Sequence, residues 1–67
     1  MIEIILNGEH KIVDPQASVM SVLASNGYDC GRVAVAINST FVARADYEKQ
    51  KFSVGDRVDV VAPMAGG

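Results

Sequence analysis

The first part of the chain alternates short apolar segments with turn residues. Residues 2–6 and 9–13 are rich in β-branched and apolar side chains, so both are predicted to be strands. Asn7-Gly8 between them is typical of a tight hairpin turn. A strict two-residue loop would pair Leu6 with Glu9, which fits the hydrophobic pattern poorly. We therefore expect a longer loop or a bulge at this hairpin.

A short helix is predicted after the second strand. Asp14-Pro15 ends that strand, because proline donates no hydrogen bond and restricts its neighbour. Ser18 is a suitable N-cap, and Gly27 is expected to end the helix, since glycine accepts the left-handed conformation of a C-terminal cap. The core-facing stripe of this helix is formed by Val19, Val22 and Leu23.

The second half of the chain predicts three more strands, at residues 33–37, 40–42 and 57–62. In the strand predicted at 33–37, Val33, Val35 and Ile37 face one way. Ala34 and Ala36 face the other way. In the last strand Val58 and Val60 are expected to share a face, with Val61 on the opposite one. Turns are predicted at Asn38-Ser39 and Val54-Gly55-Asp56, and a polar turn or helical piece at 46–51.

The element order is therefore β-β-α-β-β-β, which predicts a two-layer α+β domain. We expect a mixed sheet of four or five strands with one principal helix packed on one face. The domain is expected to span residues 1–62, and residues 63–67 to form a flexible C-terminal tail.

Length and composition are those of a small globular domain. The 67 residues are 49% hydrophobic, and a chain of this length buries only about 60% of its unfolded surface. No apolar run approaches the roughly 20 residues that span a bilayer, and the N-terminus does not resemble a signal peptide. With Cys30 as its single cysteine, the chain has no internal disulfide, so we expect a cytoplasmic protein. We also expect it to be a monomer when free and not to bind membranes.

Charge and chemistry exclude several classes of function. The net charge is −2 without a basic cluster, which disfavours nucleic-acid binding. His10 and Cys30 have no second ligand at metal-binding spacing, so we expect no metal site. Cys30 lacks an activating neighbour other than Arg32 and is interpreted as incidental, and His10 as an exposed strand residue rather than a base.

The segment after the last strand is the strongest candidate for chemistry. Pro63 interrupts further sheet pairing, and the chain then continues through Met64, Ala65, Gly66 and Gly67. Small residues allow an extended arm to enter a narrow cleft, where a Cβ atom would clash. A carboxylate at Gly67 that becomes adenylated is open to attack by a sulfur nucleophile. The alternative is a frayed end in which glycine is merely tolerated.

Several stretches together resemble the ThiS family, the sulfur carriers of thiamin biosynthesis, over nearly the whole chain. The resemblance rests on residues 33–38, 41–44, 55–61 and 63–67, and extends more weakly to Leu6-Asn7-Gly8. It implies a ubiquitin-like β-grasp fold in which the first and last strands are neighbours.

The resemblance also implies a function without catalysis by the chain itself. A ThiF-like activating enzyme would use ATP and magnesium to adenylate the carboxylate of Gly67. A persulfide derived from cysteine would then leave a thiocarboxylate, and a ThiG-like thiazole synthase would take its sulfur. The carrier would hold no permanent cofactor and have no catalytic residue.

A docking surface for these partners is expected on the sheet face away from the helix. Val61, Ala34 and Ala36 would form an apolar patch there, and a sheet of this kind needs only one buried face. Arg44 matches the family pattern and is interpreted either as a partner ion-pair residue or as a solvated surface arginine.

Other functions stay open. The chain resembles, less closely, the small subunit of molybdopterin synthase, whose tails carry prolines like Pro63, or a carrier for another pathway such as amino-acid synthesis. From a different class, the alternatives are a passive ubiquitin-like interaction module and a tag joined to lysines. Deleting Gly67 would abolish a carrier's activity and leave the binding of a passive module unchanged.

Overall fold

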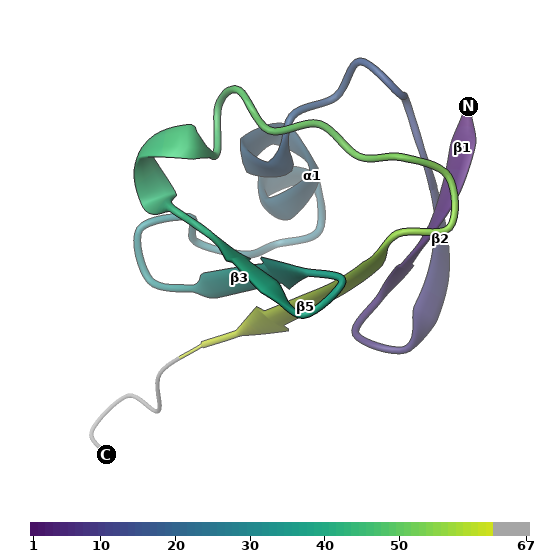
Figure 1. Cartoon of the computed structure of the whole chain (residues 1–67). Coiled ribbons are helices and arrows are strands. Elements are labelled where there is room, and N and C mark those ends of the chain that lie inside the picture. The colour runs from purple at the N-terminus through teal and green to yellow at the C-terminus, as the bar shows by residue number, and fades with distance from the viewer. Residues whose placement is uncertain (63–67) are drawn as a thin grey trace.

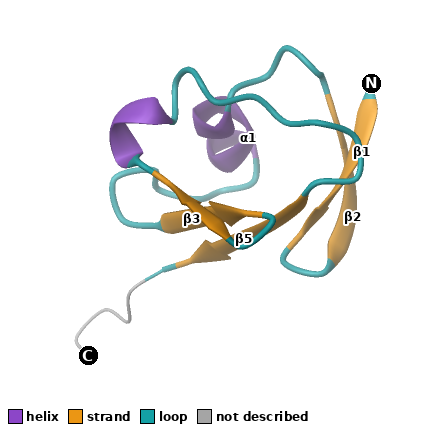
Figure 2. Cartoon of the chain, viewed as in Figure 1, coloured by secondary structure: helices purple, strands orange, loops and turns teal. Residues whose placement is uncertain are grey.

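A mixed sheet and one helix make up the part of the chain that the structure describes, residues 1–62 of this computed structural model (Figures 1 and 2). The predicted tail at 63–67 lies outside the described residues. Along residues 1–62 the elements are β1 (Ile2–Leu6), β2 (Glu9–Val13), α1 (Val19–Ser25), β3 (Ala34–Ile37), β4 (Thr40–Val42), the short 3-10 helix η1 (Arg44–Asp46) and β5 (Arg57–Val61).

The last strand lies in the centre of the sheet. The five strands formed by residues 1–62 are ordered β2-β1-β5-β3-β4, with β5 parallel to β1 and antiparallel to β3. Helix α1 covers one face, as Figure 1 shows, and the chain leaves the sheet from the end of β5. The predicted α+β class and the adjacency of the first and last strands are confirmed, and this arrangement is a β-grasp fold.

The first hairpin differs from the prediction. Leu6 pairs directly with Glu9, so the loop has two residues and no bulge. Asn7 and Gly8 have φ angles of 49° and 82°, as a type I′ turn requires. The expectation of a longer loop was wrong because Glu9 lies at the exposed edge of the sheet, where its carboxylate stays in water although its neighbour Leu6 is buried.

Both ends of α1 are where the sequence places them. The Ser18 hydroxyl accepts a hydrogen bond from the Ser21 amide at 3.2 Å. Beyond the helix Gly27 has a φ of 83°, and the Tyr28 amide donates to the Leu23 carbonyl at 2.9 Å. This cap turns the chain back, so that Tyr28 lies against the sheet.

The core lies between α1 and the sheet and follows the predicted alternation of β3 and β5. Val35, Val58 and Val60 are buried on the face toward the helix. The predicted strands were each one residue too long, since β3 begins at Ala34 and β5 ends at Val61.

The connection between η1 and β5 adds to the core more than its polar sequence indicates. Tyr47, which was assigned to a polar turn, is 2% exposed, and Phe52 is buried too. The Tyr47 hydroxyl donates to the Val33 carbonyl at 3.1 Å, so its polar end is satisfied inside the core. In residues 1–62, no helix is both long and apolar enough to cross a membrane.

Candidate functional site at the open face and the end of β5

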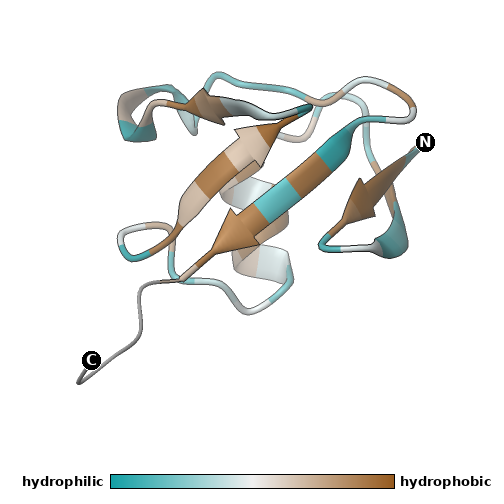
Figure 3. Ribbon diagram, turned by 60° about the horizontal axis from the view of Figure 1, so that its bottom comes forward, coloured by the Kyte–Doolittle hydropathy of each residue, from teal (hydrophilic) through white to brown (hydrophobic). Residues whose placement is uncertain are grey.

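The sheet face away from α1, here called the open face, is mixed in character. Figure 3 views the sheet from this side, with α1 behind it and hydrophilic and hydrophobic residues alternating along β5. Residues opposite one another in the register share a face, and the pairs that line the open face include Ile5 with Arg57 and Ala36 with Asp59. Both polar residues of β5, Arg57 and Asp59, therefore lie on the open face between its apolar positions.

Apolar side chains gather at the β3–β4 side of the open face and at the end of β5. Ala34 pairs with Val61, and Ala36 pairs with Phe41. Val61 is 60% exposed and Phe41 75% exposed. We call Ala34, Ala36, Phe41 and Val61 the apolar patch. Phe41 and Val61 are left in water by the fold, so the apolar patch is a candidate protein-binding surface.

Phe41 is the member of this patch that sequence reasoning missed as a site residue. It was noted only as part of a family motif, although the alternation of β4 carries the necessary signal. Because Val42 pairs with the buried Val35, the neighbouring Phe41 must face the opposite way. Small partners at Ala34 and Ala36 leave room for the ring above the sheet.

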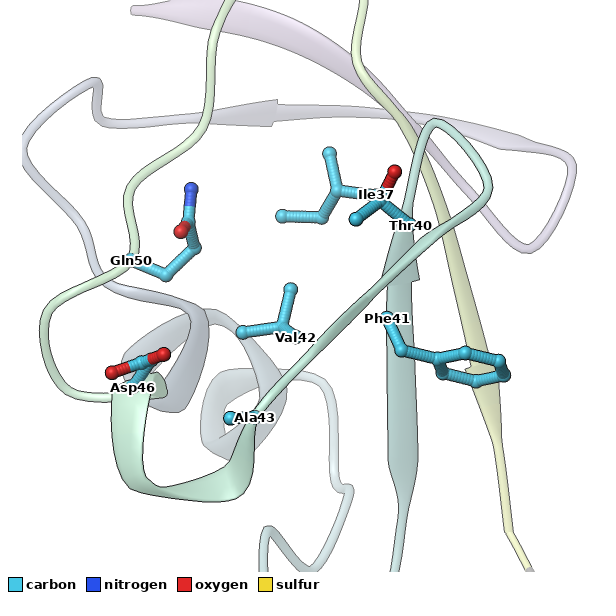
Figure 4. Close-up of a pocket in the computed structure, with 7 residues that line it drawn as sticks. All are labelled: Ile37, Thr40, Phe41, Val42, Ala43, Asp46 and Gln50. Carbon is cyan, nitrogen blue, oxygen red and sulfur yellow. The ribbon is translucent and has the colours of Figure 1, made fainter.

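The other side of β4 borders a shallow hollow. Figure 4 shows Ile37, Val42 and Gln50 around this space, with the Phe41 ring pointing away on the far side of β4. The hollow is open, and its charged residue, Asp46, is exposed. These features give it neither the enclosure nor the buried polar groups of a small-molecule site.

Arg44 lies in η1 and has an internal contact. Its guanidinium Nη2 donates to the Val33 carbonyl at 3.2 Å, the same oxygen that accepts from Tyr47. The residue is otherwise exposed. This bond ties η1 to the residue just before Ala34, where β3 begins. Arg44 therefore has a structural contact within the domain, whether or not it also contacts a partner.

The end of β5 is held by a side chain from the first hairpin. The Val60 amide donates to Oδ1 of Asn7 at 2.7 Å, and Nδ2 of Asn7 donates to the Val60 carbonyl at 3.2 Å. Nδ2 also donates to the Tyr28 hydroxyl at 3.0 Å. The sequence marked Asn7 as a turn residue within a weak part of the family resemblance and gave Tyr28 no role, because these contacts join segments far apart in the chain.

The two other candidate residues have local contacts. Cys30 is half-buried, with its thiol 3.5 Å from the Met20 carbonyl. Nδ1 of His10 lies 3.0 Å from the Glu3 carboxylate on the open face, and both side chains are exposed. No group of three or more possible metal ligands is found within residues 1–62.

The residues expected to carry the chemistry lie outside the described residues. These are Pro63, Met64, Ala65, Gly66 and Gly67. The structure places the residues that precede them: β5 ends at Val61, beside Ala34 and next to the Asn7 contacts with Val60. The apolar patch therefore adjoins the point from which the chain continues toward Gly67.

Comparison with known proteins gives a family and a fold. The model of the ThiS family matches residues 4–67 of this chain. A thiazole synthase of Paramagnetospirillum magneticum is 29% identical over 65 residues, which cover 97% of this chain and 20% of that protein. The chain thus spans one fifth of the length of this relative.

Two solved structures from Geobacter metallireducens have the same fold. A crystal structure of a thiamine biosynthesis protein (ThiS) has a TM-score of 0.78 and 23% identity, covering 98% of this chain and 100% of that one. A solution structure of a thiamine biosynthesis protein has a TM-score of 0.76 and 23% identity, covering 98% and 88%. At this identity the likeness establishes the fold.

Proposed function

This chain belongs to the ThiS family, and on that premise we propose that it is a sulfur carrier for thiamin biosynthesis whose Gly67 carboxylate is converted to a thiocarboxylate. The observation that carries the proposal is that the family match continues past the last strand and through Gly66 and Gly67. A match confined to the fold would also suit a ubiquitin-like interaction module.

The proposed chemistry takes place on an activating partner, which binds ATP and magnesium. The Gly67 carboxylate attacks the α-phosphorus of ATP, pyrophosphate leaves, and an acyl adenylate forms. The terminal sulfur of a persulfide then attacks the acyl carbon and AMP leaves. A second thiol cleaves the resulting sulfur–sulfur bond, which releases the thiocarboxylate and oxidises that thiol to a disulfide.

The described residues supply the binding surface and the base of the arm in this scheme. The apolar patch gives the partner a modest surface, suited to a complex that must form and dissociate in each cycle. Gly67 lies six residues after Val61, and six residues span at most about 20 Å when extended. A partner docked at the patch must therefore have its reaction centre within roughly that distance.

The relative named thiazole synthase supports the choice of acceptor. A segment similar to this chain makes up 20% of that protein, so the carrier-like segment and the remainder share one polypeptide. Joining two modules raises their effective concentration, which suits a sulfur donor and its acceptor. We accordingly propose a thiazole synthase as the protein that takes sulfur from Gly67, in the cytoplasm.

Intact-mass analysis tests this function. The 67-residue chain is incubated with ATP, magnesium, a ThiF-like activating enzyme and a cysteine-derived persulfide source. We expect a mass increase equal to the replacement of one oxygen by sulfur. The increase should be absent without ATP, after deletion of Gly67, and in a variant with alanine appended after Gly67.

Two results would contradict the proposal. If the mass stays unchanged with an activating enzyme that is shown to convert its native carrier protein, the sulfur-carrier function is excluded. Sulfur loading followed by transfer to molybdopterin synthase, and not to a thiazole synthase, would reassign the pathway. Each variant is first checked by circular dichroism, so that loss of the fold is not mistaken for loss of the reacting group.

A further inference from the structure

Strand β5 extends beyond its neighbour β1. The parallel pairing of the two strands ends at Leu6 with Val58, and the Asn7 amide still donates to the Val58 carbonyl at 2.9 Å. After that point the backbone turns away through Gly8 into β2. On this side Val60 therefore has no backbone partner from β1 for the next pair of hydrogen bonds.

The Asn7 side chain supplies that missing pair. Its Oδ1 accepts from the Val60 amide, and its Nδ2 donates to the Val60 carbonyl, at 2.7 and 3.2 Å. A primary amide has the same donor and acceptor arrangement as a peptide group, so it can continue the ladder by one step. The second hydrogen on Nδ2 goes to the Tyr28 hydroxyl, which fixes the orientation of the amide.

We infer that Asn7 is a positioning residue, which fixes the end of β5 so that the segment leading to Gly67 enters the activating enzyme in the correct direction; this inference rests on the proposed function. Val61 is the last residue of β5, so a shift or rotation of this strand end changes the position and direction in which the chain continues toward Gly67. Misplacement by about 1 Å in an active site can cost on the order of 100-fold in rate.

The second hairpin provides a matched comparison. Asn38 has a φ of 51°, close to the 49° of Asn7, and its Oδ1 accepts from the Arg57 amide at 3.0 Å. Its Nδ2 donates to the Asp56 carboxylate at 3.0 Å. Both asparagines thus accept from a backbone amide of β5 through Oδ1, but Asn38 holds the start of β5 and Asn7 holds its end.

Glycine at either position keeps the left-handed turn and removes the side-chain contacts. For Asn7→Gly we expect the kcat of adenylation, measured as pyrophosphate release at varied carrier concentration, to fall about tenfold, with KM changed by less than about threefold. KM is largely kept because most of the apolar patch lies on β3 and β4. For Asn38→Gly we expect both constants to stay within about twofold of the wild type.

Two further variants separate positioning from stability. Asn7→Asp keeps an oxygen that accepts from Val60 and tolerates a positive φ, but its second oxygen replaces the donor that faces the Val60 carbonyl, so it should restore only part of the lost kcat. Tyr28→Phe removes a single hydroxyl contact and should lower kcat by no more than about threefold, since the two bonds to Val60 remain. All assays are run well below the melting temperature of each variant, and hydrogen exchange reports protection of the Val60 amide.

The outcomes are distinguishable. Loss of Val60 protection with a wild-type kcat in Asn7→Gly would overturn the inference, as would an equal loss of kcat in Asn38→Gly. If Asn7→Gly does not fold, an Asn7→Asp protein with an unchanged kcat and an exchanging Val60 amide would overturn it too. A wild-type chain that is never adenylated would instead overturn the proposed function itself.

Discussion

The two faces of the sheet are made by the same strands but differ in what their apolar residues do. On the helix side Val35 is completely buried between neighbours, and Leu23 of α1 is 1% exposed. On the open face Phe41 and Val61 keep most of their surface in water. Burial stabilises a fold roughly in proportion to the area removed from water, so the open-face residues contribute little to stability. The proposed docking of a partner would account for their apolar character.

The largest expected effect comes from truncating a buried side chain in the core between α1 and the sheet. Leu23→Ala should lower the free energy of unfolding by about 2–4 kcal/mol, because it removes buried contacts and leaves a cavity. Urea denaturation followed by circular dichroism measures the change. A loss below about 1 kcal/mol would show that the core adjusts more freely than its burial indicates, and would weaken the contrast between the two faces.

A truncation on the open face should weaken partner binding and leave stability nearly unchanged. Phe41→Ala is expected to change the free energy of unfolding by less than about 1 kcal/mol, since the ring is exposed. Affinity for the activating enzyme, measured by calorimetry, should fall about tenfold if the ring is a central contact.

Ile12 offers the matched control for that experiment. It is 63% exposed, lies on β2 at the opposite edge of the sheet from β4, and is not part of the apolar patch. Ile12→Ala should leave the affinity within about twofold of the wild type. Equal losses for Ile12→Ala and Phe41→Ala would remove the case for a localised patch.

Arg44→Met tests a residue that contacts the buried Val33, next to Ala34 of the apolar patch. The variant loses the bond to the Val33 carbonyl, which Tyr47 still satisfies, so the free energy of unfolding should fall by about 0.5–1 kcal/mol. We expect the affinity for the activating enzyme to stay within about twofold. A larger loss of affinity that shrinks as salt is added would instead identify Arg44 as a partner ion-pair residue.

The smallest effect is expected at Cys30, which is half-buried at the border of the core and is not part of the apolar patch. Cys30→Ser changes a half-buried thiol that contacts the Met20 carbonyl, and a hydroxyl can make the same contact. Stability should change by less than about 0.5 kcal/mol, and thiocarboxylate formation, followed by intact mass, should proceed at the wild-type rate. Loss of sulfur loading in a folded variant would show that this thiol relays sulfur.

Much of the fold was predictable because its signals are local. Ser18 and Gly27 mark the two ends of α1 through capping geometry that each residue type favours on its own. Alternation along β3 and β5 correctly assigned Val35, Val58 and Val61 to their faces. The family motif, Gly67 included, is likewise a property of the linear sequence and needs no tertiary structure to be found.

The sequence by itself thus determined the element order, the faces of the central strands and the identity of the residue proposed to react. Only the tertiary structure decided which distant segments meet: Tyr47 in the core, Phe41 across Ala36, and the Asn7 amide on Val60. A local pattern records whether a position is apolar or suited to a turn. It does not record a hydrogen bond across 53 residues, because that contact forms only after the strands have packed into one sheet.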